Sequence, residues 1–251
     1  MYEAHSMGGM GYRLLRPENF NPDIKYPVVI TLHNAGGMGS PGGKNYNIKN
    51  LRFVNQQFAS SELRLAYPAY ILCPQVNAAF SKQHLDICKA IIAGLPSVEM
   101  SRIYVMGQSM GGEGAYTFIA ADPDYFAAAI AASGFGELIK APAVLKYFDL
   151  WALHGVEDST VPYEKDLAFF EAVKSLGGRM KFTSFVKAGN STEKWIIGDY
   201  PMTNILILSS GRRHTTQAAG PGFDPEPNTL KWLFSKRKNS SELSVGANTV
   251  P

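Results

Sequence analysis

Charged residues are scarce in this 251-residue chain, where Asp, Glu, Lys and Arg together make up 18% and apolar residues make up 45%. This balance excludes an intrinsically disordered chain, which combines few apolar side chains with high charge. The formal net charge of +3 is too small to indicate nucleic-acid binding. The one basic cluster, at residues 236–238, suits the solvated end of a helix. We therefore expect no nucleic-acid partner.

Long apolar runs and cysteines are also scarce. No apolar run is long enough to span a membrane, so we expect no membrane partner. The N-terminal segment MYEAHSMGGMGYR lacks the features of a signal peptide, which predicts a cytoplasmic protein or a processed secreted form. Two cysteines, Cys73 and Cys88, cannot make a disulfide framework, and we expect two buried thiols. Compartment and oligomeric state stay open.

Short apolar runs alternate with segments of helical period along the chain. We expect strands at Tyr26–Leu32, Ala69–Cys73, Ile103–Met106, Ala127–Ala132, Leu150–Leu153 and Lys181–Val186. We expect helices at Leu51–Ser60, Ser81–Ala93, Met110–Ala121, Tyr163–Leu176 and Asn228–Ser235. The alternation predicts an α/β fold, with a mostly parallel twisted sheet and helices on both faces. One domain is expected over residues 1–238, followed by a polar, flexible tail over residues 239–251.

Residues 107–111 read Gly-Gln-Ser-Met-Gly and match G-x-S-x-G. The bare pattern is weak, but here a predicted strand runs into it and a helix of small residues leaves it. That setting is typical of a nucleophile elbow, in which the turn strains the serine backbone and the glycines avoid collisions. We therefore predict that Ser109 is a nucleophile. The alternative is a glycine-rich turn in which Ser109 only caps the helix.

A serine hydroxyl needs a base to take its proton and an acid to hold that base. Five histidines are candidates, and two of them, His33 and His154, end strands and are expected to fix loops through backbone hydrogen bonds. His5 lies in an N-terminus that we expect to be irregular, and His84 lies in an amphipathic helix. His214 alone follows both Ser109 and an acid candidate in the order nucleophile, acid, base. We predict His214 as the base.

The acid candidate is Asp158, in the loop after the predicted strand Leu150–Leu153. This loop leaves the carboxyl end of the strand, where open α/β sheets place their sites. Glu157 is the alternative, and Asp149 lies at the wrong end of the strand. Asp158 could also be only a cap for the helix that follows.

Acyl transfer also needs donors for the oxyanion that develops in the transition state. The first expected donor is the backbone N–H of Met110, directly after the nucleophile. The loop after Tyr26–Leu32 reads HNAGG, and its Asn34 and Ala35 are expected to give the second donor. Gln108 and Trp195 are expected to line the substrate pocket.

Four segments together resemble the α/β-hydrolase superfamily: LHNAGG, RIYVMGQSMGGEGA, PDYFAAAIAASG and LWALHGVEDSTVP. In detail they are similar to the branch of poly(hydroxyalkanoate) depolymerase-like, feruloyl-esterase-like and "predicted peptidase" proteins, over roughly residues 12–187. The resemblance implies a serine esterase that needs no cofactor and uses an acyl-enzyme intermediate. It also suggests carbohydrate-linked acyl or feruloyl esters, small or attached to a polysaccharide, as substrates. No large cap domain is expected, because only residues 134–148 occupy the usual cap position.

The sequence departs from the pattern of this branch at two positions. Asn34 replaces the usual glycine, and we expect the loop to survive because asparagine tolerates a left-handed backbone. Asn190 stands where the branch usually has its histidine, and His214 comes 24 residues later. Either an insertion has displaced the base to His214, which we favour, or the chain is a catalytically inactive binding protein.

Other functions find less support in the sequence. Residues 37–42 formally match the dinucleotide-binding pattern G-x-G-x-x-G, but Pro41 and the polar run after it delay the helix that this motif requires. The separated histidines and cysteines show no zinc-site spacing, so we expect no metal. A serine peptidase of the same fold remains an alternative to an esterase.

Overall fold

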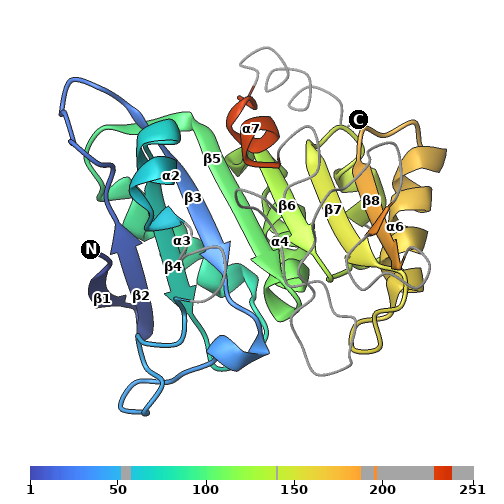
Figure 1. The fold of residues 1–251 in the computed structure, drawn as a ribbon, viewed down its shortest axis with the longest axis horizontal. Coiled ribbons are helices and arrows are strands. Elements are labelled where there is room, and N and C mark those ends of the chain that lie inside the picture. The colour runs from blue at the N-terminus through green and yellow to red at the C-terminus, as the bar shows by residue number, and fades with distance from the viewer. Residues whose placement is uncertain (52–57, 140, 188–194, 197–228, 239–251) are drawn as a thin grey trace, which may run out of the picture.

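The computed structural model describes residues 1–51, 58–139, 141–187, 195–196 and 229–238. These residues form a nine-stranded sheet in the order β1-β2-β4-β3-β5-β6-β7-β8-β9 (Figure 1). The strands are β1 (Glu3–Met7), β2 (Met10–Leu15), β3 (Tyr26–Leu32), β4 (Tyr70–Gln75), β5 (Val98–Gln108), β6 (Ala128–Ala132), β7 (Leu150–Gly155), β8 (Lys181–Lys187) and β9 (Trp195–Ile196). From β4 to β8 every pairing is parallel, and the outer strands β1, β2 and β9 pair antiparallel. The predicted α/β class is confirmed.

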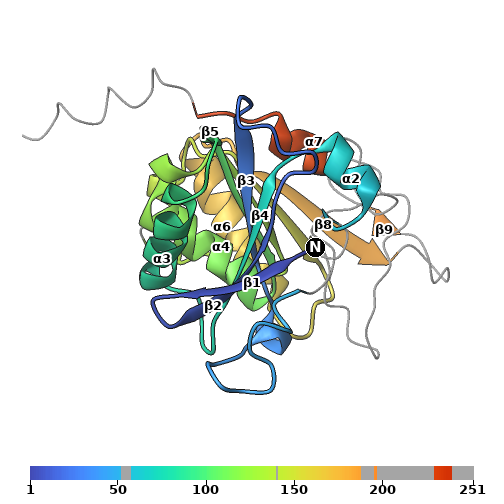
Figure 2. The ribbon, with the colours of Figure 1, turned by 90° about the vertical axis from the view of Figure 1, so that its left-hand side faces the viewer.

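Helices cover both faces of the sheet (Figure 2). On one face lie α3 (Lys82–Ala93), α4 (Met110–Ala121) and α6 (Tyr163–Ser175), and on the other lie α2 (Ser61–Ala66) and α7 (Thr229–Phe234). Strand β3 is buried at every position, which explains its continuous apolar sequence. The sequence therefore predicted β3 from a pattern that is typical of a strand covered on both sides.

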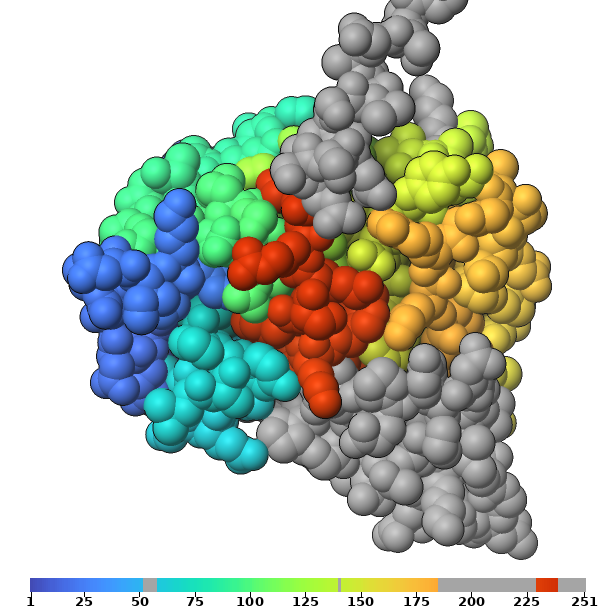
Figure 3. Space-filling view, turned by 90° about the horizontal axis from the view of Figure 1, so that it is seen from above, coloured from blue at the N-terminus to red at the C-terminus, as the bar shows by residue number. Residues whose placement is uncertain are grey.

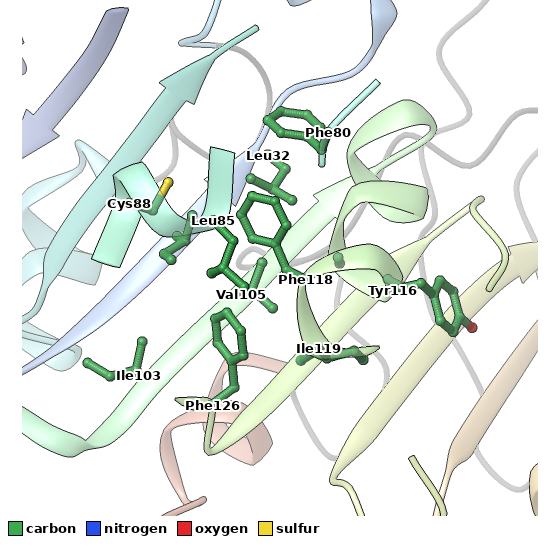
Figure 4. Packing of buried hydrophobic residues seen from close by; sticks show 14 of the residues in the cluster. Leu32, Phe80, Leu85, Cys88, Ile103, Val105, Tyr116, Phe118, Ile119 and Phe126 are labelled. Atoms are coloured by element: carbon green, nitrogen blue, oxygen red, sulfur yellow. The ribbon is translucent and has the colours of Figure 1, made fainter. Parts of the chain in front are cut away.

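The larger core lies between the sheet and the helices α3, α4 and α6. Figure 4 shows Phe118 of α4 reaching between Leu85 of α3 and Val105 of β5. All three side chains are fully buried. This packing fixes α4, the helix that follows the predicted nucleophile, against the central strands.

The second core lies under α2 and α7, which pack side by side (Figures 2 and 3). The ring centroids of Tyr67 and Phe234 are 4.7 Å apart across this contact. Trp232 of α7 meets Trp151 of β7 edge to face at 5.3 Å. The predicted C-terminal helix therefore closes the face of the sheet opposite to α4.

The N-terminus differs from the prediction. It is not irregular, because β1 and β2 form a hairpin on the edge of the sheet, and His5 lies in β1. The turn uses Gly8 and Gly9, both at positive φ (57° and 79°), a conformation that glycine adopts without strain. These strands escaped prediction because their side chains are only partly apolar and partly buried.

Two short helices were not predicted from the sequence. Helix α2 begins at Ser61, because the side chain of Ser60 accepts a hydrogen bond from Leu63 N at 3.3 Å and caps it. The predicted helix Leu51–Ser60 precedes α2. Its residues 52–57 lie outside the described residues, and Phe58 directly after them is helical, so this helix stays a prediction. Between β6 and β7, the described part of the chain contains only the short helix α5 (Ala141–Val144).

Several expectations concern the chain as a whole. Cys73 and Cys88 are free and buried, as predicted. None of the helices in the described ranges has the length and apolar character that crossing a membrane requires. The tail at residues 239–251 lies outside those ranges, so the boundary at residue 238 stays a prediction.

Candidate active site

The sheet register brings the predicted site residues to one edge. Leu32 of β3 pairs with Gly107 of β5, Gln108 pairs with Ala132 of β6, and Ala132 pairs with Leu153 of β7. The loops that follow these strands therefore leave the sheet at one level, along the lower edge in Figure 1. Since neighbouring strands lie about 4.8 Å apart, the ends of β5 and β7 are about 10 Å apart, with β6 between them. One imidazole between a serine and a carboxylate spans such a gap.

Ser109 has the strained backbone of a nucleophile elbow. It lies between β5 and α4 with φ 58° and ψ −124°, a conformation that non-glycine residues rarely adopt. Its backbone N–H is held by Ala132 O at 2.9 Å, and its side chain makes no capping hydrogen bond to α4. Ser109 therefore holds the N-cap position only through its backbone, and its hydroxyl is not used to cap the helix.

Close backbone packing holds this turn. A Cβ atom on Gly107 would lie 2.2 Å from Gly111 O, and one on Gly111 would lie 2.2 Å from Leu32 O. A Cβ on Gly112 would lie 2.6 Å from Ala132 O. Helix α4 therefore approaches β3 and β6 more closely than any side chain allows, which explains the glycines around Ser109.

His33 anchors the loop after β3. Its Nε2 accepts a hydrogen bond from Val76 N at 3.1 Å, so its proton is on Nδ1, which donates to Asn34 O at 2.7 Å. Burial lowers the pKa of His33 to about 4, against the opposing effect of its hydrogen bond to Asn34. His33 is therefore neutral and holds the Asn34 carbonyl, as expected for a strand-end histidine.

This anchor also sets the direction of a candidate oxyanion donor. The Asn34 carbonyl accepts hydrogen bonds from His33 and from Gly37 N, so the N–H of the same trans peptide, that of Ala35, points away from them. Within the described residues, the backbone N–H groups of Asn34, Ala35 and Met110 make no backbone hydrogen bond. The N–H of Met110 also opens the first turn of α4, where helix N–H groups lack intrahelical partners. Among the described residues, no backbone carbonyl therefore accepts a hydrogen bond from the predicted oxyanion donors.

Asp158 is buried in the loop after β7. Its Oδ1 accepts hydrogen bonds from Thr160 N at 2.8 Å and Val161 N at 3.0 Å, which fixes the loop. Its Oδ2 lies 3.5 Å from Nε2 of His154. It does not cap α6, because that helix starts at Tyr163 after Pro162, without a side-chain cap. Glu157 is exposed, which favours Asp158 as the acid.

His154 lies in a fully buried charged cluster. Its Nδ1 is 2.8 Å from Oδ2 of Asp166, and its Nε2 is 3.1 Å from Val161 O. The Val161 carbonyl can only accept. Burial raises the pKa of Asp166, but its hydrogen bonds with His154 and Tyr116 oppose this, and we assign it as a carboxylate, so both ring nitrogens of His154 carry a proton. Burial alone would lower the pKa of His154, but the hydrogen bonds to Asp158 and Asp166 outweigh it and raise the pKa to about 9. An imidazolium without a free nitrogen cannot act as the base for Ser109.

Two members of this cluster, Asp166 and Tyr116, were not predicted from the sequence. Asp166 lies in the first turn of α6 and is fully buried, and its Oδ1 accepts a hydrogen bond from Tyr116 of α4 at 2.5 Å. The sequence does contain an indication, because Asp166 shares a helix face with the buried Phe169 and Val173, at spacings of three and seven. A carboxylate on an apolar helix face requires a buried partner.

The remaining predicted residues are only partly placed. Gln108 ends β5 directly before Ser109 and is 5% exposed. Trp195 belongs to β9, but its side chain, like the whole of His214, lies outside the described residues. In the described part of the chain, no group of three or more His, Cys, Asp or Glu side chains is placed to hold a metal ion.

The sheet order, the strained serine between β5 and α4, and the loop after β7 that carries the buried Asp158 fit an α/β-hydrolase fold. No protein-family model and no curated protein matches the sequence. Solved structures do match. The chain is similar to a thermostable esterase at 26% identity and a TM-score of 0.73, over 94% of this chain and 63% of that one.

Two further structures share the fold at lower identity. A ferulic acid esterase matches at 18% identity and a TM-score of 0.53, over 73% of this chain and 88% of that one. The acylaminoacyl peptidase of Pyrococcus horikoshii matches at 16% identity and a TM-score of 0.54, over 74% of this chain and 37% of that one. The chain thus spans less than two thirds of the length of the thermostable esterase and of the peptidase. All three relatives are hydrolases by name.

Proposed function

We propose that the chain is a serine hydrolase that cleaves carboxylic esters through an acyl-enzyme intermediate. The observation that carries the proposal is the backbone of Ser109, at φ 58° and ψ −124°, in a turn packed too tightly for any Cβ at Gly107 or Gly111. Such strain persists only where the surrounding structure enforces it, and it is typical of active sites. The fold and its esterase relatives point to the same chemistry.

In the proposed mechanism, Ser109 Oγ attacks the ester carbonyl while His214 takes its proton. Asp158 accepts the Nδ1–H of His214 and stabilises the imidazolium that forms. The N–H groups of Met110 and of Asn34 or Ala35 bind the oxyanion of the tetrahedral intermediate. His214 then protonates the leaving alcohol, and water hydrolyses the acyl-enzyme by the same steps in reverse. His154 is excluded as the base because both of its nitrogens are used.

The finer substrate proposal is a carbohydrate-linked acyl or feruloyl ester. A pocket of about 150 Å³ lies beyond the end of β4, and Ser40, Asn77, Gln83 and His84 line it together with the apolar Met10, Val76 and Ile87. Neither Ser109 nor the candidate oxyanion donors line it, so it could hold only a part of the substrate distant from the ester. Backbone amides, a hydroxyl and side-chain amides suit the hydroxyl groups of a sugar better than a long acyl chain. The ferulic acid esterase supports this proposal, whereas the acylaminoacyl peptidase supports a peptide substrate.

The test is hydrolysis of p-nitrophenyl esters from acetate to octanoate, combined with an organophosphonate that labels activated serines. We expect turnover and a single labelled peptide that contains Ser109. The Ser109→Ala variant should lose almost all turnover and remain folded, and His214→Ala should lose nearly all acylation. Labelling of a different serine would refute the assignment. Absence of both turnover and labelling would favour an inactive binding protein, and preference for acylaminoacyl peptides over esters would favour the peptidase.

A further inference from the structure

Asn34 occupies its position for a reason other than backbone freedom. The sequence suggested that asparagine replaces glycine there because it tolerates a left-handed backbone. The structure corrects this, since Asn34 has φ −75° and ψ 176°, an extended conformation that any residue adopts. The replacement must therefore be explained by the side chain. Glycine would fit the backbone equally well but would leave the side-chain contact unmade.

The Asn34 side chain joins the oxyanion loop to the nucleophile strand. Its Nδ2 donates a hydrogen bond to Oε1 of Gln108 at 3.0 Å. Asn34 follows β3, while Gln108 is the last residue of β5 and directly precedes Ser109. This bond therefore connects the two segments that carry the candidate oxyanion donors, Asn34 and Ala35 on one side and Met110 on the other.

The contact is costly for the fold. Gln108 is 5% exposed, and within the described residues its Nε2 and the Oδ1 of Asn34 are buried without a hydrogen-bond partner. Buried polar atoms of this kind oppose folding, and apolar side chains of the same shape would avoid the loss. Such exceptions in folded proteins require a specific explanation, and function is one of them.

We propose that Asn34 and Gln108 are positioning residues that hold the two halves of the oxyanion hole at a fixed separation. The inference rests on the proposed function, because it assumes an oxyanion formed at Ser109. The hole contacts the substrate oxygen fully only in the transition state. Loss of the amide contact should therefore lower kcat and leave KM nearly unchanged. A displacement of about 1 Å in such a site can lower the rate about 100-fold.

The experiment compares Asn34→Gly, Gln108→Met and the double variant with the wild-type chain. Asn34→Gly restores the residue usual in the related sequences, and Gln108→Met keeps the chain length but removes the amide. Asn21→Gly is the matched control, since the Asn21 side chain also makes a loop hydrogen bond, to Asp23 N, but lies before β3 at the opposite edge. For each variant, kcat and KM for a p-nitrophenyl ester and stability in urea are measured.

A transition-state probe separates positioning from general damage. Ser109 Oγ adds to the carbonyl carbon of a trifluoromethyl ketone, the carbonyl oxygen takes the electron pair as an oxyanion, and the serine proton passes to the base. The corresponding trifluoromethyl alcohol has no carbonyl and reports binding of the ground state. We expect both single variants to lose roughly 10- to 100-fold in kcat and in affinity for the ketone, with less than about 3-fold change for the alcohol.

Further outcomes decide the proposal. The double variant should lose no more than the worse single variant, because both changes break one contact. Gln108→Met alone leaves Asn34 Nδ2 without its acceptor and should lose stability, whereas the double variant, which removes both amides, should regain part of that loss. Wild-type kcat in both single variants, with Ser109 still labelled by the organophosphonate, would overturn the inference and leave the proposed function intact. Failure of the wild type to label at Ser109 would overturn both.

Discussion

Nδ1 of His154 lies 2.8 Å from Oδ2 of Asp166 and joins strand β7 to helix α6 inside the protein. The same ring reaches the candidate acid Asp158 on its other side, at 3.5 Å. Tyr116, seven residues after the candidate nucleophile, completes the chain through its hydrogen bond to Asp166. The acid loop and the nucleophile helix are thus linked below the site by one buried polar cluster.

The first prediction concerns stability and pH. The pKa of His154 rises from 6.5 in the unfolded chain to about 9 in the fold. Its contribution to stability is therefore fully present below pH 6.5 and is lost as the pH rises through about 9, on the order of 3 kcal/mol in total. Urea unfolding between pH 6 and 10 should show this decline, and His154→Gln should flatten it. His5→Gln, on the edge strand β1, serves as the control and should leave the decline in stability unchanged. If stability declines equally steeply in His154→Gln, groups other than His154 cause the decline.

The second prediction concerns the partner of His154. Asp166→Asn keeps a hydrogen-bond acceptor near Nδ1 but removes the negative charge, and it should destabilise the fold by about 3–5 kcal/mol. Tyr116→Phe removes one hydroxyl from the same carboxylate and should cost only about 1–2 kcal/mol. The free energy of unfolding in urea measures both variants. Similar losses would show that the charge of Asp166 has no role beyond hydrogen bonding.

The third prediction concerns the packing of the elbow. In Gly111→Ala the new Cβ would lie 2.2 Å from Leu32 O, a backbone atom that cannot turn aside. The helix must shift, with a loss of about 3 kcal/mol or more and a fall in kcat of about 100-fold. Gly94→Ala is the matched control, because its nearest contact is 3.5 Å away. Normal turnover in Gly111→Ala would contradict the close approach of α4 to β3.

The fourth prediction distinguishes the two acid candidates. Asp158→Asn retains an oxygen for the N–H groups of Thr160 and Val161, so the loop should keep its shape while the negative charge is lost. We expect kcat to fall by about 10³- to 10⁴-fold. Glu157→Gln, at an exposed neighbouring position, should change kcat less than about 2-fold. Ester turnover at neutral pH measures both, and equal effects would overturn the assignment of Asp158.

Much of the central architecture was predictable from the sequence. Strand β3 (Tyr26–Leu32) and helix α4 (Met110–Ala121) match their predicted bounds, because a doubly covered strand and a helix of small residues leave clear patterns. The hairpin of β1 and β2 was missed, since the edge strand β1 has no buried position and the buried positions of β2 are interrupted by the half-buried Tyr12 and Arg13. Edge elements depend on tertiary pairing more than on local sequence.

The sequence predicted which residues belong to the candidate site, but it did not predict the contacts between their side chains. Motif spacing identified Ser109, Asp158 and the loop that contains Asn34. The side-chain contact of Asn34 with Gln108 was not predictable, because it joins residues 74 positions apart, and a substitution for glycine first suggests backbone conformation. His214 stays a prediction from chain order, since it lies outside the described residues.

The common level at which β3, β5 and β7 end has a consequence for how the protein would acquire the proposed activity. The candidate oxyanion loop, the candidate nucleophile and the candidate acid come from three distant parts of the chain and meet only after these strands and β6 have paired in register. Pairings over such sequence separations form slowly, because long loops must close first. Partly folded chains with intact helices should therefore be inert. During refolding, ester turnover should return together with completion of the parallel sheet and later than helical circular dichroism.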